Sequence, residues 1–206
     1  MSTLVTNIEI KEGLWALRAF KARRPNGLHA SFFQRFWLIV GDSIRKEVKK
    51  ISDESKVPEY LNITNIVLIL KIVKPESLGN YCTISLCNAM YKIMTKIIVA
   101  RLIPHLHKLV SPFQSTFVSG RRSVDNAIVV QKLIHTISNK KGQVGYMTIK
   151  VDLEKVYDKI EWSFIRKVLI NANLPHNLMA LIISCVSLVS TSILFNGGNV
   201  DPIFPT

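Results

Sequence analysis

The stretch from Val144 to Trp162 constrains the fold of this chain more than any other. It begins with alternating, largely apolar residues, which predict a buried strand over 144–152. Four acids then appear within ten residues: Asp152, Glu154, Asp158 and Glu161. A carboxylate at the end of a buried strand is held rigidly, and such positions often carry a divalent metal or a general base. A strand that runs into a solvated, charged turn fits the same spacing, so spacing alone leaves both interpretations open.

The charge of the chain is uneven. The formal net charge is +13, and residues 92–150 carry ten Lys or Arg against one acid, Asp125, which gives this span +9. Such a surface favours polyanions, because each phosphate contact releases counterions. General solubility and binding to a membrane surface are the alternatives, and nucleic acid is the partner that the charge favours.

Length and composition permit one large domain or two small ones with a real core, since 48% of the 206 residues are hydrophobic. Three cysteines and no recognisable signal peptide predict reduced thiols in an intracellular protein.

We expect no zinc site, because His105 and His107 point to different faces of a helix. We also expect no membrane span, because Asn173, Pro175 and Ser184 interrupt the uncharged run 168–200.

Apolar periodicity and turn residues predict the other elements. Helices are expected over 8–20, 29–51, 123–138, 163–171 and 176–188, and strands over 66–73 and 192–196. A helix is also expected around Ile93 and Ile97. Ser123 is the expected N-cap of the 123–138 helix, with Asp125 at the positive end of its dipole. The first 60 residues contain no pattern that indicates chemistry.

The residue types and spacing of the acidic stretch form a specific motif. Asp152, Tyr157, Asp158 and Trp162 at the end of an apolar strand resemble the first catalytic motif of reverse transcriptases, in the form of non-LTR (LINE-type) retrotransposons. The resemblance implies that Asp152 ligates Mg²⁺, that Tyr157 lies under the sugar of the incoming nucleotide, and that Leu153 also borders the nucleotide. Val156 stands where the family usually has Ala.

A second resemblance covers residues 68–102. The family reads Leu-Ile-Pro-Lys at Leu68 to Lys71, with Leu70 here in place of the proline, and this implies a role for Lys71 beside the nucleotide triphosphate. Ile84 to Asn88 also match, as do several residues of the following helix. Cys82 stands where the family has an arginine. A neutral thiol cannot replace the bidentate, charge-assisted bonds of a guanidinium to phosphate.

A third resemblance covers residues 111–126. Six residues reproduce a family motif: Gln114, Phe117, Gly120, Arg121, Asp125 and Asn126. The resemblance and the basic charge together predict that Gln114, Arg121 and Arg122 contact nucleic acid, with Gly120 permitting a close approach of the backbone. Taken singly, each residue also fits a glycine turn followed by the first turn of a helix.

The resemblance implies an α/β (α+β) fragment of a right-hand polymerase. It implies a helical N-terminal extension (1–60), a fingers region (61–143) and a truncated, partial palm (144–206). The palm sheet is expected to be antiparallel, with Met147 to Asp152 pairing with Ser192 to Asn196.

The resemblance implies an RNA-directed DNA polymerase that uses template–primer and deoxynucleoside triphosphates with Mg²⁺, in the nucleus or cytoplasm. The paired aspartates and the glycine–glutamine motif of the family do not occur in the 206 residues. We therefore expect a fragment that is inactive alone. A non-catalytic nucleic-acid-binding remnant that uses the 92–150 surface, and a relic without a partner, are the alternatives.

Overall fold

The computed structural model describes residues 4–20, 27–114, 118–140, 145–147, 149, 159–195 and 197–204. The chain divides into two compact units, and each is described by itself. The first unit comprises residues 1–99 and 162–206, and the second comprises residues 100–161. The helices of residues 1–60 thus share a unit with the sheet. The predicted division at residues 60 and 143 stays a prediction.

Three helices open the first unit: α1 (Asn7–Trp15), α2 (Ala30–Arg35) and α3 (Trp37–Glu54). A capping box starts α1, because the side chains of Thr6 and Glu9 each accept a hydrogen bond from the other's backbone N–H. The predicted 8–20 helix ends early, at Trp15. The predicted 29–51 helix is broken at Phe36, whose backbone leaves the helical region (φ −99°, ψ 24°). The apolar residues of 29–51 are therefore divided between α2 and α3.

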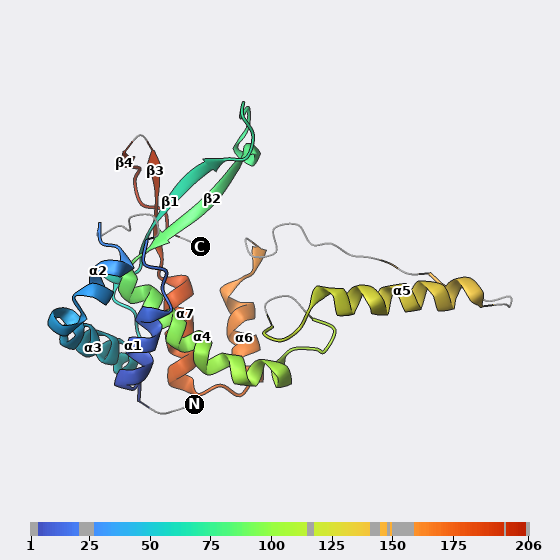
Figure 1. The fold of residues 1–206 in the computed structure, drawn as a ribbon, viewed down its shortest axis with the longest axis horizontal. Coiled ribbons are helices and arrows are strands. Elements are labelled where there is room, and N and C mark those ends of the chain that lie inside the picture. The colour runs from blue at the N-terminus through green and yellow to red at the C-terminus, as the bar shows by residue number, and fades with distance from the viewer. Residues whose placement is uncertain are drawn as a thin grey trace. The chain divides into compact units, whose positions relative to one another are not determined.

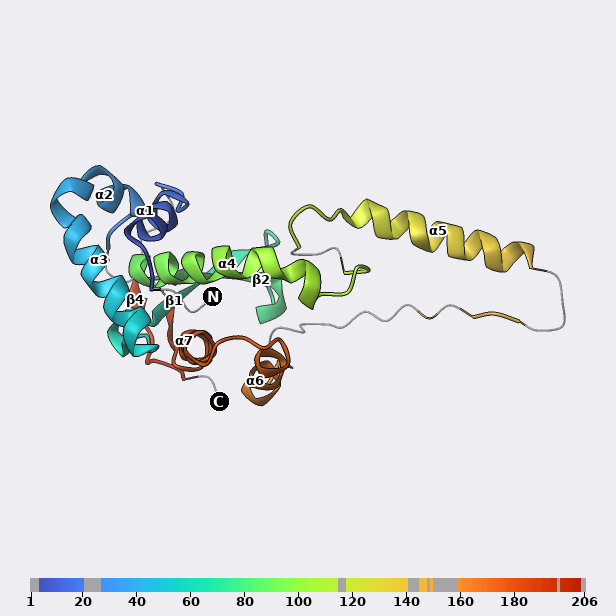
Figure 2. The same cartoon turned by 90° about the horizontal axis from the view of Figure 1, so that it is seen from below.

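The core of the first unit lies around the N-terminal part of α4 (Ala89–Leu109), which passes between α1 and α7 (His176–Ser187) (Figures 1 and 2). Fully buried side chains from α1, α3 and α4 include Ile10, Leu14, Ile44, Val48, Ile93 and Met94. The helix α1 approaches α4 closely at Gly13, where an added Cβ would lie 3.3 Å from the carbonyl oxygen of Ile93. Burial of these apolar side chains is the main stabilising contribution.

The C-terminal end of α7 is fixed by side chains from distant parts of the chain. The last four carbonyls of a helix have no partner within it. In α7, the carbonyl of Ser184 accepts from Asn62 Nδ2 at 3.2 Å, and that of Cys185 accepts from the Tyr91 hydroxyl at 3.1 Å. The Ser184 hydroxyl accepts from the Val57 N–H at 2.8 Å. These bonds join α7 to the 57–62 segment and to α4, and one of them satisfies the amide nitrogen of the buried Asn62.

The first unit contains a mixed sheet in the order β2-β1-β3-β4. Its strands are β1 (Ile63–Leu70), β2 (Tyr81–Cys87), β3 (Ser190–Phe195) and β4 (Gly198–Asn199). The strands β1 and β2 form an antiparallel hairpin, whereas β1 and β3 run parallel, with Ile63 opposite Ser190. Two short 3₁₀ helices flank β1: η1 (Glu59–Leu61) and η2 (Leu78–Asn80). Helices and a sheet in one unit confirm the α/β class.

The sequence predicts that Met147–Asp152 pairs antiparallel with Ser192–Asn196. For the residues of this pairing that the structure describes, the prediction is wrong. Met147 and Ile149 lie outside any strand. Both sides of β3 are already occupied, by β1 on one side and by Asn199 and Ile203 on the other. Among the described residues, both edges of β3 thus have hydrogen-bonded neighbours. The remainder of the predicted pairing (148, 150–152 and 196) lies outside the described residues.

The helices α6 (Trp162–Asn171) and α7 follow the predicted positions closely, and the turn between them places Asn173 at φ 51°. The second unit contains the end of α4 and the helix α5 (Ser123–Asn139), in which no residue is buried. Ser123 is not the N-cap of α5. Arg122 is the N-cap residue, and its side chain makes no capping hydrogen bond to α5. Asp125 lies in the first turn as expected. Among the described residues, no helix is long and apolar enough to cross a membrane.

Candidate nucleic-acid interface

Lys71 lies at the base of the loop that closes the β1–β2 hairpin. Its backbone N–H donates to the Asn80 carbonyl at 2.9 Å, which continues the ladder one residue beyond β1. Its ammonium group donates to the Gly79 carbonyl at 3.2 Å. The side chain is exposed, so this single bond to a surface carbonyl leaves it able to turn toward an anion.

The register of the hairpin places Lys71 and Cys82 on one face. Ile69 pairs with Cys82, and the bond from Lys71 to Asn80 extends the same register by two residues. Paired residues share a face and successive residues alternate between faces. Lys71 and Cys82 are therefore diagonal neighbours, about 7–8 Å apart at their Cα atoms. The lysine expected at the triphosphate and the position where the family has an arginine thus lie side by side.

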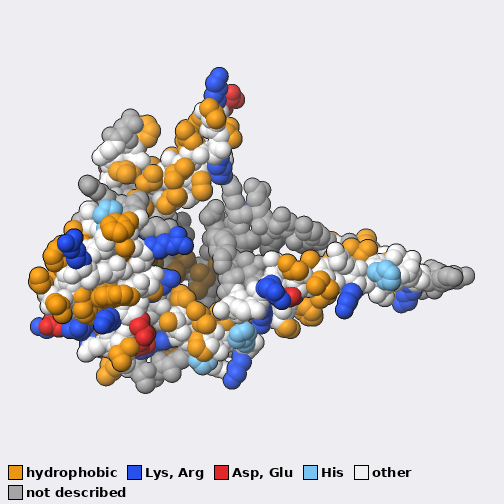
Figure 3. Space-filling model, viewed as in Figure 1, with side chains coloured by type: hydrophobic (Ala, Val, Ile, Leu, Met, Phe, Trp, Pro, Cys, Tyr) orange, Lys and Arg blue, Asp and Glu red, His pale blue; other side chains and the backbone are white. Residues whose placement is uncertain are grey.

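The hairpin projects from the rest of its unit and exposes apolar side chains on its distal half (Figures 1 and 3). Its exposed apolar residues are Ile69, Leu70, Ile72, Val73 and Leu78. Charged residues gather at the tip, where Lys71 and Lys74 accompany one acid, Glu76. The tip is therefore both basic and amphipathic, as expected of a segment that contacts phosphates beside sugars and bases.

In the second unit, the predicted nucleic-acid residues surround a turn after α4. Gln114 closes this turn, because its N–H donates to the Ser111 carbonyl at 3.0 Å. Gly120 adopts φ +80°, a conformation that favours glycine, and an added Cβ there would meet nothing within 4 Å. The positive φ therefore accounts for a glycine here, and the close approach predicted from the sequence stays a prediction.

Arg121 folds back onto that turn. Its Nη1 donates to the carbonyls of Ser111 (2.5 Å) and Gln114 (2.7 Å), and its Nη2 donates to the carbonyl of Val110 (3.3 Å). Three of its five N–H donors thus have backbone partners. The adjacent Arg122 is exposed. The direct nucleic-acid contacts predicted for Gln114, Arg121 and Arg122 stay predictions.

The residues predicted for the catalytic centre, Asp152, Leu153 and Tyr157, lie outside the described residues. Within the described ranges, no group of three His, Cys, Asp or Glu side chains could hold a metal ion. The Mg²⁺ expected from the motif around Asp152 therefore has no ligand set among the residues that the structure describes. It stays an expectation from the family.

Comparison with known protein families matches residues 72–204 to "Reverse transcriptase (RNA-dependent DNA polymerase)". The match covers more than half of the chain and contains β2 and the Gln114–Asn126 motif, and it begins one residue after Lys71. The chain belongs to the reverse transcriptase family. This confirms the membership inferred from the three motifs. Reverse transcriptases bind template nucleic acid and deoxynucleoside triphosphates and generally use Mg²⁺.

Two relatives place this reverse transcriptase chain among retrotransposon proteins. It is 25% identical over 165 residues to "Transposon TX1 uncharacterized 149 kDa protein" of Xenopus laevis, covering 80% of this chain and 12% of that protein. It is 26% identical over 165 residues to "Retrovirus-related Pol polyprotein from type-1 retrotransposable element R1" of Bradysia coprophila, covering 77% of this chain and 16% of that protein. The chain thus spans less than a fifth of either relative, and the non-LTR (LINE-type) resemblance is confirmed.

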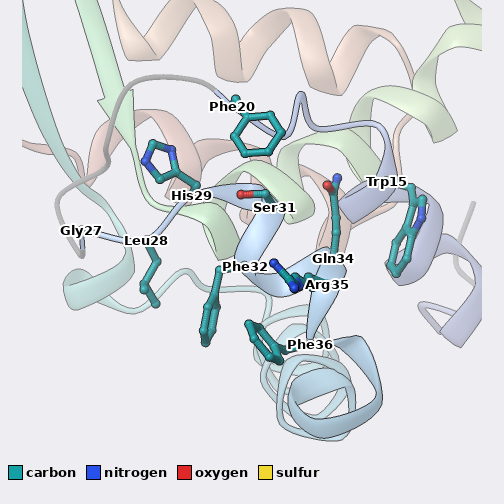
Figure 4. Close-up of a pocket in the computed structure, with 10 residues that line it drawn as sticks. All are labelled: Trp15, Phe20, Gly27, Leu28, His29, Ser31, Phe32, Gln34, Arg35 and Phe36. Atoms are coloured by element: carbon teal, nitrogen blue, oxygen red, sulfur yellow. The ribbon is translucent and has the colours of Figure 1, made fainter.

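One pocket of this reverse transcriptase chain was not predicted from the sequence. It lies between α1 and α2, has a volume of about 640 Å³, and its lining includes Trp15, Phe20, Phe32 and Phe36 (Figure 4). Phe32 and Phe36 lie side by side with ring centroids 5.1 Å apart, and Arg35 lies over the Phe36 ring. Gln34 supports the wall by donating to the carbonyls of Leu14 and Leu17. The sequence signal for this pocket is the group of aromatic residues in 32–37, which lies within the predicted 29–51 helix.

Proposed function

We propose that this chain is part of a retrotransposon RNA-directed DNA polymerase. In this proposal the β1–β2 hairpin faces the nucleotide triphosphate, and the basic residues of 92–150 hold nucleic acid. The observation that carries it is the family match over residues 72–204, which contains β2 and the basic span 92–150 and begins one residue after Lys71. As the 206-residue chain alone, it binds nucleic acid weakly and without sequence preference, and it does not extend a primer.

The binding part of the proposal rests on charge. Described cations of the second unit that are exposed include Lys108, Arg122, Lys132 and Lys140, and Asp125 is the one acid in the sequence between positions 108 and 140. Lys and Arg contacts to phosphate release condensed counterions, whatever the base sequence. Affinity for single-stranded RNA or DNA should therefore fall steeply as salt rises.

The catalytic part of the proposal rests on what two-metal phosphoryl transfer requires. Two ions ~3.5–4 Å apart are clamped by carboxylates, usually from more than one segment. Asp152 belongs to the first acidic segment, and the printed sequence contains no Asp-Asp pair to supply a second. Asp152 alone does not position both the primer 3′-hydroxyl and the leaving pyrophosphate. The chemistry that Mg²⁺ supplies in this family is the stabilisation of those two oxygens.

A titration of fluorescent single-stranded RNA and DNA at several salt concentrations tests the binding. We expect a linear fall of log affinity with log salt, of similar slope for unrelated sequences. An affinity that stays flat between low and physiological salt would show that the positive charge serves only solubility.

Primer extension with Mg²⁺, a primed RNA template and all four deoxynucleoside triphosphates tests the catalytic part. No extension above background is expected. Extension by the chain as printed, together with its loss in Asp152→Ala, would contradict the proposal and would show an active polymerase.

A further inference from the structure

Two side chains of the Gln114–Asn126 motif hold one short piece of backbone. Arg121 donates to the carbonyls of Val110, Ser111 and Gln114. Asn126 Nδ2 donates to the Phe113 carbonyl at 2.6 Å. Four of the five carbonyls in residues 110–114 thus accept a hydrogen bond from these two side chains. All of these residues belong to the second unit, and we call the arrangement the 110–114 clamp.

The clamp requires a guanidinium at position 121. Its donors form a rigid planar fork, which can bond acceptors in several directions at once. A lysine ammonium is a compact charge on a flexible stem, and it cannot reproduce three bonds from two nitrogens. Residues 110–114 also follow directly on α4, which ends at Leu109. The negative end of the helix dipole there favours a nearby cation.

The spacing of the motif explains how both side chains reach the same backbone. Arg121 lies two residues before the first residue of α5, and Asn126 is the fourth residue of that helix. Gly120 turns the chain immediately before Arg121. The 110–114 turn is consequently bonded both to Arg121, just before α5, and to Asn126, in the first turns of α5. These bonds fix Gln114 at the end of the turn.

We propose that Arg121 and Asn126 are positioning residues, which hold the 110–114 turn so that Gln114 is presented to nucleic acid. Arg122, which is exposed and takes no part in the clamp, is then the phosphate contact of this motif. The assignment rests on the proposed nucleic-acid binding. It separates two adjacent arginines whose roles cannot be distinguished from the sequence.

The test compares Arg121→Lys, Arg121→Ala, Asn126→Ala and Arg122→Ala in the full chain. Amide hydrogen exchange of peptides covering 110–114 measures the clamp. Affinity for a single-stranded RNA at several salt concentrations measures nucleic-acid binding. We expect faster exchange in both Arg121 variants and in Asn126→Ala, and unchanged exchange in Arg122→Ala. Arg121→Lys keeps the charge and so should weaken binding without changing the salt slope, whereas Arg122→Ala should lower the slope by about 0.7, the share of one phosphate on a single strand.

Each result bears on a separate part of the proposal. Unchanged exchange at 110–114 in the Arg121 variants would overturn the clamp, whether or not the protein binds RNA. Faster exchange with unaltered RNA affinity in Arg121→Lys would overturn the positioning role. Equal loss of salt slope in Arg121→Ala and Arg122→Ala, with no change in exchange, would make Arg121 a phosphate contact.

If the unaltered chain binds no RNA, the proposed function and the positioning role fail, and the exchange result still decides the clamp. Far-UV circular dichroism checks that each variant folds, and Asn126→Ala provides the test if both Arg121 variants fail.

Discussion

Lys71 and Cys82 are diagonal neighbours on one face of the β1–β2 hairpin, at the loop end of its ladder. The pairing of Ile69 with Cys82 and the bond from Lys71 to Asn80 fix this relationship. A cation and an exposed thiol thus lie together at the place where a triphosphate is expected.

Replacing Cys82 by Arg should create an anion site at this face. A second cation beside Lys71 would add charge-assisted, bidentate bonds, each contributing about 1.5–3 kcal/mol. We expect the affinity for a deoxynucleoside triphosphate, measured by isothermal titration calorimetry, to rise by at least about tenfold, which corresponds to 1.4 kcal/mol. Thr83→Arg is the matched control, because Thr83 is exposed on the opposite face of β2. Equal gains in the two variants would show that the added charge acts without a specific site.

Removing the Tyr91 hydroxyl should destabilise the first unit. Tyr91→Phe would leave the carbonyl of Cys185, near the end of α7, without its side-chain donor. Leaving a half-buried acceptor unpaired costs about 1–3 kcal/mol. Urea unfolding should show this loss, whereas Tyr81→Phe on the hairpin should be close to neutral. A Tyr91→Phe variant as stable as the unaltered chain would mean that another group satisfies this carbonyl.

The Cys185 thiol should make stability depend on pH in the alkaline range. Burial raises the pKa of Cys185 from 9.0 to about 12. Above pH 9 the unfolded chain loses this proton while the folded chain keeps it, so the stabilising contribution is complete below pH 9 and declines toward pH 12. Between pH 8 and pH 10 we expect a loss of about 1.4 kcal/mol from this group. Cys185→Ala should abolish that component of the difference in urea unfolding, and an identical pH dependence in the variant would contradict the assignment.

Gly120 should tolerate no side chain, although there is space for one. Its φ of +80° is the relevant constraint, since an added Cβ would meet nothing within 4 Å. An L-residue in the left-handed region costs about 1–2 kcal/mol, so Gly120→Ala should loosen the second unit, measured as faster amide exchange in 118–126. Gly145 also has open space and no positive φ, and Gly145→Ala should leave this exchange unchanged.

The helices of this protein were largely predictable from sequence, because their apolar residues recur at helical spacing. The strand β2 was missed because most of its residues are exposed on both faces, so that it carries no alternating burial pattern. The parallel pairing of β1 with β3 was also missed, since partners so distant along the chain leave no local signal. The bonds of Arg121 escaped prediction for another reason. Its acceptors are backbone carbonyls, and every residue type has one.

The parallel pairing of β1 with β3 has a consequence for how the chain folds. The contact between Val57 and Ser184 spans 127 positions, and the neighbouring β1–β3 ladder spans a similar distance. During synthesis the N-terminal helices and the β1–β2 hairpin can form early. The edge of β1 that pairs with β3 stays unpaired until Ser190 has left the ribosome. Contacts this distant pay the entropy of closing a long loop before they stabilise anything, which slows folding. Throughout that interval the unpaired N–H and C=O groups on this edge of β1 can form hydrogen bonds with strands of other chains.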